Sequence, residues 1–313
     1  MEGFERYHII MNETCIYNEE TNEMTLIIQC YRSPLNNSFH MKIDDKLYYP
    51  LTIGKYGTEC KAIFNGTLEK FKDKEVTICQ DDYESKKMVM KFPFESIKTK
   101  FHPDSIIIST MCKDEDNRLE EWFNYCIKIG FDFIVIFNNT STRTDKIKEL
   151  DSKYSNLFIV DFPYKAKCGH WNNIQRVSLT IGISALKYYC KWIALIDCDE
   201  FIYIPSRNDN NLRLFLHDKD SHIGMSSKLL TNKNTTDIIN NNVTQICKYI
   251  AQERHYDKHI HRTSGLGDII ANVHKGGKIQ PQNVITYYHI WVNNRYKYSE
   301  NMVETNDLIN FEF

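Results

Sequence analysis

The sequence predicts an α/β fold in which a mostly parallel sheet carries helices on both faces, preceded by a small all-β N-terminal domain. After residue 100, continuous apolar runs alternate with segments of helical spacing, which is typical of buried parallel strands joined by crossover helices. Before that point, short strand-like runs are separated by turn-rich segments. We therefore expect a β-rich accessory domain at residues 1–100 and a second domain at residues 101–313.

The first domain contains four short runs with high strand propensity, and turn residues such as Asn36-Asn37-Ser38 separate them. Short strands with regular turn signals predict a small sandwich or barrel-like domain. No cluster of catalytic residue types occurs in it. The four runs are residues 24–28, 47–51, 76–79 and 88–92.

The second domain begins with a continuous apolar strand at residues 105–110. Residues 116–129 have helical spacing, and Gly130 stands where a helix C-cap glycine belongs. Strands follow at residues 133–137, 157–160 and 192–196, with helices at residues 144–154 and 171–189. The order is Rossmann-like, with right-handed crossovers expected. The glycine-rich fingerprint of dinucleotide-binding proteins is absent after the first strand.

Composition narrows the classes of function. A net charge of −2 argues against a protein that binds nucleic acid through bulk electrostatics. No apolar stretch is long enough to predict a membrane span, and the N-terminal residues lack the pattern of a signal peptide. The ten cysteines form no Cys-x-x-Cys pair. We therefore expect mostly reduced cysteines and a cytoplasmic protein.

The strongest chemical signal is the acidic segment Asp197-Cys198-Asp199-Glu200, which follows the strand at residues 192–196. In open α/β sheets ligands bind at the carboxyl ends of the strands, where this segment lies. Asp197 and Asp199 are two residues apart, so on an extended chain they point to the same side. Two such carboxylates repel unless a cation lies between them, and Mg²⁺ or Mn²⁺ shared with a diphosphate is the common solution. The alternative is a solvated acidic turn.

The order and spacing of several motifs resemble glycosyltransferases of the GT-A fold, and more narrowly family 92 and related family 2-like enzymes. The resemblance covers roughly residues 104–300, and its DxD motif is Asp197-Cys198-Asp199. The sequence departs from the family pattern at Asp114, where the family has Asn, and at Asn138, where it has an acid. The other matching pieces are Lys113 and Glu115, Leu119-Glu120-Glu121-Trp122, Gly130-Phe131-Asp132, Asn139-Thr140-Ser141 with Asp145, Gln175, Trp192 and Glu200-Phe201.

The resemblance implies a metal-dependent transfer of a sugar from a UDP- or GDP-sugar to a hydroxyl of a glycan or glycoprotein acceptor, with inversion. It implies Mn²⁺ or Mg²⁺ held by Asp197, Asp199 and the late His289. The alternative for His289 is a buried structural histidine. The donor contacts implied are Thr110, Lys113, Glu115, Asn138, Asn139, Gln175, Asp197 and, at the diphosphate, Lys275.

Some of these donor contacts have an alternative interpretation as ordinary surface residues. Lys113 and Glu115 could form a solvated helix start, Gln175 an exposed helix position, and Lys275 a surface lysine. An inverting transferase also needs a carboxylate base for the acceptor hydroxyl. Glu253, Asp257 and Asp268 are the candidates, and the sequence does not choose among them.

Two other classes of function remain open. A metal-dependent phosphoesterase or nucleotidyltransferase could use the same carboxylates, but it would usually need more carboxylates on neighbouring strands and a basic groove. A non-catalytic carbohydrate-binding protein would use the β-rich domain, and the intact pair Asp197 and Asp199 argues against it.

Overall fold

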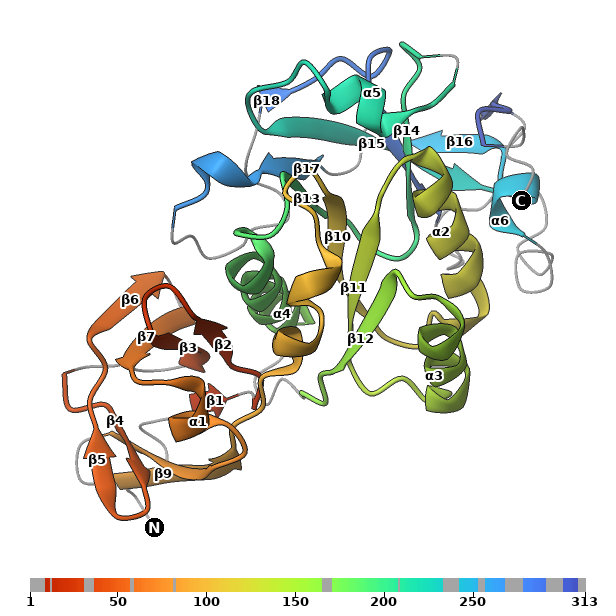
Figure 1. Cartoon of the computed structure of the whole chain (residues 1–313). Coiled ribbons are helices and arrows are strands. Elements are labelled where there is room, and N and C mark those ends of the chain that lie inside the picture. The colour runs from red at the N-terminus through yellow and green to blue at the C-terminus, as the bar shows by residue number, and fades with distance from the viewer. Residues whose placement is uncertain are drawn as a thin grey trace. The chain divides into compact units, whose positions relative to one another are not determined.

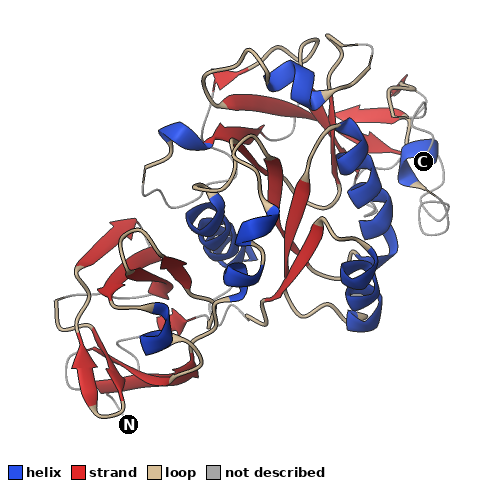
Figure 2. Ribbon diagram, viewed as in Figure 1, coloured by secondary structure: helices blue, strands red, loops and turns tan. Residues whose placement is uncertain are grey.

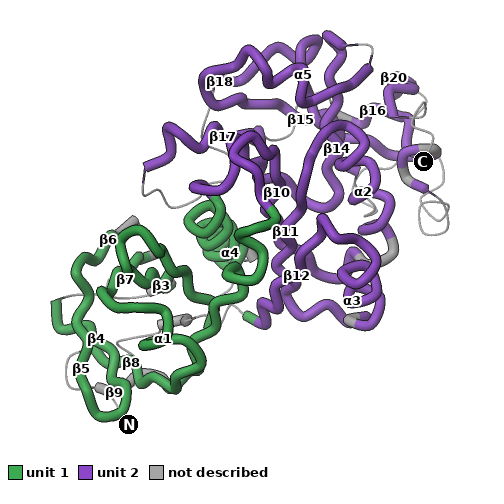
Figure 3. The backbone as a smooth tube through the Cα atoms, viewed as in Figure 1, with its two compact units in different colours: residues 1–100, 164–186, 268–271 green, residues 101–163, 187–267, 272–313 purple. Residues whose placement is uncertain are grey.

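The computed structural model describes most of the chain and divides it into two compact units (Figure 3). The first unit contains residues 1–100, 164–186 and 268–271, and the second contains residues 101–163, 187–267 and 272–313. The described residues are 9–11, 13–30, 37–56, 59–80, 83–164, 171–207, 209–232, 242–252, 257–267, 278–290 and 301–308.

The first unit is built from two antiparallel sheets. One has the order β1-β3-β7-β6 with β2 paired to β3, and the other has the order β5-β4-β8-β9. Their inner faces share a core of buried residues that includes Leu26, Met41 and Phe64. The elements are β1 (Ile9–Met11), β2 (Ile16–Asn18), β3 (Glu23–Cys30), β4 (His40–Ile43), β5 (Lys46–Tyr48), β6 (Thr52–Tyr56), β7 (Glu59–Asn65), α1 (Leu68–Phe71), β8 (Glu75–Gln80), β9 (Tyr83–Val89) and helix α4 (Trp171–Leu186), which contacts β2 and β3.

The second unit is organised around one large mixed sheet (Figures 1 and 2). Its main path is β12-β11-β10-β13-β17-β15-β16-β20, and β14, β18 and β19 join it from the side. The strands are β10 (Ile106–Cys112), β11 (Phe133–Asn138), β12 (Leu157–Asp161), β13 (Trp192–Leu195), β14 (Glu200–Tyr203), β15 (Ile223–Thr231), β16 (Tyr249–Gln252), β17 (Asp257–Arg262), β18 (Lys278–Ile279), β19 (Thr286–Ile290) and β20 (Val303–Glu304).

The expected GT-A, Rossmann-like sheet, mostly parallel with helices on both faces, is wrong. Parallel pairing joins β10, β11, β12 and β13, but β17 then pairs with β13 in the antiparallel sense, and the sheet continues as a curled mixed sheet. The physical reason is that strands β14, β15, β17 and β19 pair with partners that are distant in sequence. Local patterns in the sequence do not set the order of such strands.

Helix α2 (Asp116–Ile129) fixes the part of the sheet that carries the acidic segment. Its buried face contains Leu119, Trp122 and Phe123, and it ends at Gly130, whose φ of 118° suits a left-handed cap. Two polar atoms on the buried face bind β14: Trp122 Nε1 donates to the carbonyl of Glu200 at 2.9 Å, and the Tyr125 hydroxyl donates to the carbonyl of Ile202 at 2.6 Å. The helix therefore holds β14 in place.

The remaining described helices are short or peripheral. They are α3 (Thr144–Lys153), which contacts β12, α5 (Leu212–Leu216) and α6 (Val243–Ile246). In the described part of the chain, every helix is too short or too polar to cross a bilayer. The eight cysteines whose side chains the structure describes are buried thiols that form no disulfide.

Candidate functional site

The acidic segment lies between two strands of the second unit. β13 ends at Leu195, and Glu200 begins β14. Glu200 pairs in register with His289 of β19, and the backbone N–H of Ile290 donates to the Asp199 carbonyl at 3.0 Å. This pairing brings the imidazole to the acidic segment, with His289 Nε2 lying 3.2 Å from Asp199 Oδ2. Two of the three predicted metal ligands are therefore direct neighbours.

A buried lysine contacts the other two carboxylates. Lys258 Nζ lies 2.7 Å from Asp197 Oδ2 and 3.2 Å from Glu200 Oε2. Its position follows from the register of β17, because the next residue, His259, pairs with Leu195 at the end of β13. Glu200 Oε2 also accepts the backbone N–H of Asp197 at 2.9 Å. The chain itself therefore supplies a positive partner for the acids.

Sequence reasoning did not find Lys258. Lys258 occupies a buried position of β17, which spans residues 257–262. A lysine inside a strand is the one sequence signal that could have indicated its role. Its partner Asp197 is 61 residues away, so no local pattern links the two side chains.

Burial and charge act against each other in this cluster. Burial alone would lower the pKa of Lys258, but the carboxylates of Asp197 and Glu200 outweigh it and hold that pKa above its ordinary value. Burial raises the pKa of Glu200 to about 7, although Lys258 opposes the rise. The buried ammonium group of Lys258 is therefore always charged at neutral pH and needs these acids.

The Asp199–His289 pair shows the same competition. Burial opposes the charge of both groups, but each favours the ionised form of the other. The pKa of Asp199 is lowered as a result, and that of His289 rises to about 9. The imidazole is therefore a cation at neutral pH when nothing else occupies the position.

Arg118, in the first turn of α2, adds a third cation. Its guanidinium group pairs with Glu115, and its charge helps to lower the pKa of Asp199. The buried Nη1 atom of Arg118 makes no hydrogen bond within the described part of the chain. A buried donor without an acceptor is costly, so an incoming anion is a fitting partner for it. Sequence reasoning missed Arg118 because it focused on Lys113 and Glu115.

The turns that follow β10 and β11 are tied together. Asp114 Oδ1 accepts from the backbone N–H and the hydroxyl of Thr142 at 2.6 and 2.7 Å, and the Asp114 N–H donates to the Ser141 hydroxyl at 3.0 Å. Asn138 Oδ1 accepts the Ser141 N–H at 3.2 Å, and Asn139 Nδ2 donates to the Phe162 carbonyl at 2.8 Å. Both asparagine side chains therefore shape this double turn, and their contact with a donor stays a prediction.

The other predicted donor contacts belong to different elements of the fold. Thr110 is fully buried in β10, with Oγ1 3.7 Å from Cys198 Sγ, which ties β10 to the acidic segment. Lys113 is exposed and Glu115 is the N-cap residue of α2. Gln175 is buried on α4 and belongs to the first unit. Lys275 lies outside the described residues.

Of the three candidate bases, the structure describes Asp257 alone. It is the first residue of β17, and strand alternation places it on the face opposite to Lys258. Glu253 and Asp268 lie outside the described residues. The choice of base therefore stays a prediction.

The residues at the acidic segment can be tested for their fit to a divalent cation. Asp199 and His289 offer an oxygen and a nitrogen donor 3.2 Å apart, whereas Asp197 Oδ2 is engaged by Lys258. Within the described ranges, no three His, Cys, Asp or Glu side chains are grouped closely enough to hold a metal ion. Mg²⁺ and Mn²⁺ are often held by one or two side chains together with phosphate oxygens and water. The pair Asp199 and His289 fits that arrangement.

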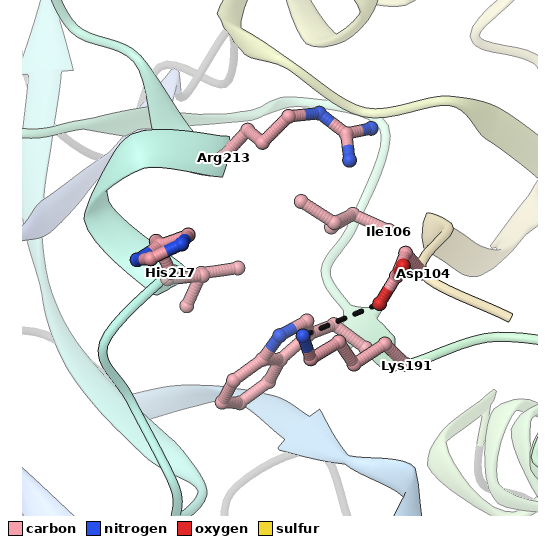
Figure 4. A pocket seen from close by; sticks show the side chains of 7 residues that line it. Asp104, Ile106, Lys191, Arg213 and His217 are labelled. Carbon is pink, nitrogen blue, oxygen red and sulfur yellow. Dashed lines mark hydrogen bonds and ion pairs between the residues drawn. The ribbon is translucent and has the colours of Figure 1, made fainter.

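A cavity of about 290 Å³ lies at the amino ends of the parallel strands, whereas the acidic segment follows the carboxyl end of β13 (Figure 4). Ile106 and Trp192, which begin β10 and β13, contribute to its walls. Its basic side chains already have acidic partners: Lys191 pairs with Asp104, Arg213 with Asp132, and His217 with Asp218. The cavity therefore lacks the excess charge of an anion site. The full lining is Asp104, Ile106, Lys191, Trp192, Arg213, Leu216 and His217.

Comparison with known proteins gives one distant relative. The chain is 26% identical over 104 residues to a glycosyltransferase family 92 protein of Ricinus communis. The matched stretch is 33% of this chain and 18% of that protein, so the chain spans less than a fifth of the length of its relative. No protein-family model matches the chain.

Two solved structures that match the chain resemble it only weakly. A 4-diphosphocytidyl-2C-methyl-D-erythritol synthase from Anaerococcus prevotii is 11% identical, with a TM-score of 0.29 over 54% of this chain and 73% of that one. A maltogenic amylase from S. marinus is also 11% identical, with a TM-score of 0.19 over 64% of this chain and 33% of that one. Similarities at this level carry no argument about fold or activity.

Proposed function

We propose that the protein is a metal-dependent glycosyltransferase that moves a sugar from a nucleoside diphosphate sugar to a hydroxyl of a glycan or glycoprotein acceptor, with inversion. The distant similarity to a glycosyltransferase family 92 protein supports the transferase class. The observation that carries the proposal is the neighbouring pair of donors, Asp199 and His289, together with Arg118, whose charge acts on Asp199 and whose Nη1 atom makes no hydrogen bond within the described residues.

In the proposed reaction, negative charge develops on the oxygens of the leaving diphosphate. The acceptor oxygen bonds to the anomeric carbon, the bond from that carbon to the diphosphate breaks, and the diphosphate leaves with the electron pair. Stabilising the charge on the leaving oxygens is therefore the largest task. Mn²⁺ or Mg²⁺ held by Asp199 and His289 would supply Lewis-acid charge there. Arg118 offers a buried N–H donor to the same oxygens.

The remaining residues have separate tasks in this proposal. The carboxyl group of Asp197 accepts from Lys258 through Oδ2, and in this proposal it also accepts a hydrogen bond from a hydroxyl of the donor. A carboxylate takes the proton of the acceptor hydroxyl, and Asp257, Glu253 and Asp268 remain the candidates. Lys113, Glu115 and the double turn at Asn138 and Asn139 are proposed to lie against the nucleoside.

The proposal is tested with a panel of nucleotides and UDP- or GDP-sugars, with and without Mn²⁺. We expect UDP or GDP to raise the melting temperature only when the metal is present, because a ligand that binds the native state alone stabilises it. We also expect release of a nucleoside diphosphate during turnover. The absence of a response to every nucleotide would contradict the proposal.

The products distinguish the alternatives. Release of a nucleoside monophosphate or pyrophosphate would replace the proposal with a phosphoesterase or nucleotidyltransferase. Glycan binding without a response to nucleotides would replace it with a carbohydrate-binding protein.

A further inference from the structure

The buried lysine beside the acidic segment has a consequence for metal binding. We infer that Lys258 is a positioning residue that occupies the place of a metal ion at Asp197 and Glu200, and so confines a divalent cation to Asp199 and His289. The inference rests on the proposed metal site. It assigns Asp197, which the sequence argument made a metal ligand, to an internal ammonium group.

The distances support this assignment. With Nζ 2.7 Å from Asp197 Oδ2 and 3.2 Å from Glu200 Oε2, the ammonium group bonds to both carboxylates at hydrogen-bond length. A divalent cation bonded to the same Oδ2 atom at about 2.1 Å would lie beside a like charge in a poorly solvated place. Metal and ammonium therefore compete for the Oδ2 atom of Asp197.

Burial favours the ammonium group of Lys258 over a metal ion as the partner of Asp197 and Glu200. The side chains of Lys258 and Glu200 are 2% and 1% exposed, so removing either partner would leave an uncompensated buried charge. The backbone of Lys258 is also fixed, because β17 is paired on one side with β13 and on the other with β15. The lysine cannot leave for solvent when a metal arrives.

Exposure does not distinguish the two aspartates, because the side chain of Asp197 is 32% exposed; the difference is the group that each carboxylate contacts, a lysine ammonium at Asp197 and a metal-binding imidazole at Asp199. The side chain of Asp199 is 24% exposed and that of His289 is 10% exposed. A divalent cation can therefore reach Asp199 from solvent and bind both its carboxylate and the imidazole of His289. The carboxylates of the acidic segment thus differ in their partners. Asp197 and Glu200 bind the fixed ammonium group of Lys258, and Asp199 with His289 binds an exchangeable cation.

A purely structural ion pair would make a different prediction from this inference. Such a pair would affect only the fraction of folded protein, and the affinity of the folded protein for Mn²⁺ would not change. The decisive measurement is therefore Mn²⁺ binding by folded protein without any substrate, followed through the paramagnetic resonance signal of free Mn²⁺. Circular dichroism confirms that each variant is folded.

Single substitutions of Asp197 and Asp199, with Lys258 left in place, test which of the two aspartates binds the metal. We expect Asp199→Asn to weaken Mn²⁺ binding by about tenfold or more and Asp197→Asn to change it by less than about threefold, where tenfold corresponds to ~1.4 kcal/mol. Equal losses in the two variants would overturn the inference. Asp197 is partly exposed, so the Asp197→Asn arm remains decisive even if a lysine variant does not fold.

Substitution of the lysine tests competition directly. We expect Lys258→Met to bind Mn²⁺ about tenfold more tightly, because it opens Asp197 and Glu200 to the metal. Adding Asp197→Asn to Lys258→Met should remove most of that gain, which a double-mutant cycle measures as coupling. An unchanged affinity in folded Lys258→Met would overturn the inference.

The outcomes also separate this inference from the proposed function. If the unaltered protein binds neither Mn²⁺ nor nucleotides, the proposed function fails. A gain of Mn²⁺ binding in Lys258→Met would still support the role of Lys258, and no gain would reject it.

Discussion

His289 Nε2 lies 3.2 Å from Asp199 Oδ2, across the antiparallel pair of β14 and β19. The contact joins two residues that are 90 positions apart, and it is made because Glu200 and His289 are direct partners in the register. The pair can serve in two ways. Without a metal it is a charged contact that stabilises the fold, and in the proposed function it would supply two ligands to a metal ion.

The charged contact predicts a dependence of stability on pH. The pKa of His289 in the folded protein is about 9, above its ordinary value near 6.5. The folded state therefore binds the proton more tightly, so the stabilisation is fully present below about pH 6.5 and is lost as pH rises through about 9. Urea unfolding of the protein and of His289→Gln at pH 6 and pH 9.5 measures it. The free-energy difference between the two should shrink at the higher pH, and a constant difference would contradict the prediction.

Loss of Asp199 should abolish metal-dependent behaviour. We expect Asp199→Ala to remove the stabilisation by nucleotide with Mn²⁺ and to lower turnover by about 100-fold or more, since it removes a ligand of the ion that neutralises the leaving group. Thermal shift and a sugar-transfer assay measure the two effects. Asp218→Ala is a matched control, because Asp218 is an exposed aspartate that also contacts a histidine, His217. Unchanged turnover in Asp199→Ala would refute the metal role.

Loss of the guanidinium group should weaken the binding of diphosphates. We expect Arg118→Gln to raise the Kd for UDP or GDP by about tenfold, because a charge-assisted hydrogen bond is worth about 1.5–3 kcal/mol. The affinity for the free nucleoside should change far less, since the nucleoside lacks the anionic oxygens. Isothermal titration measures both ligands. Arg213→Gln serves as the control, because Arg213 pairs with Asp132 at the opposite edge of the sheet. Equal weakening of nucleoside and nucleotide would argue against this role for Arg118.

The buried cluster should also show strong energetic coupling. Lys258→Met leaves Glu200 buried without its cation, and we expect a loss of about 3–5 kcal/mol of unfolding free energy. Glu200→Gln keeps the contact of Lys258 with Asp197 and should cost less. The double variant should cost less than the sum of the two, because the residues share one interaction. Urea denaturation of the four proteins gives the coupling, and simple additivity would contradict it.

Much of the parallel part of the sheet could be predicted from the sequence. The observed helix Asp116–Ile129 has the predicted bounds, and the strands that begin at Phe133, Leu157 and Trp192 begin where they were expected. These elements follow from local signals: continuous apolar runs, a helical period and a glycine at a helix end. The neighbouring positions of Asp199 and His289 also agree with their common assignment to one site, and their role there remains a proposal.

The mixed half of the sheet, from β14 onward, could not be predicted in the same way. Strands β14, β15, β17 and β19 acquire their neighbours through pairing over long sequence separations, and alternating or mixed strands give weak local signals. Lys258 illustrates the difficulty. A lysine is normally expected at the surface, and only the register of β17 against β13 places its ammonium group beside Asp197.

Helix α2 links the chemistry of the acidic segment to the geometry of a single rigid element. Its first turn carries Arg118, and one turn later Trp122 holds the carbonyl of Glu200. The helix therefore sets the distance between the guanidinium group of Arg118 and the acidic segment. Insertion of one residue between Arg118 and Trp122 would rotate the guanidinium group by about 100° around the helix axis, away from Asp199, while leaving every side chain of the cluster chemically intact.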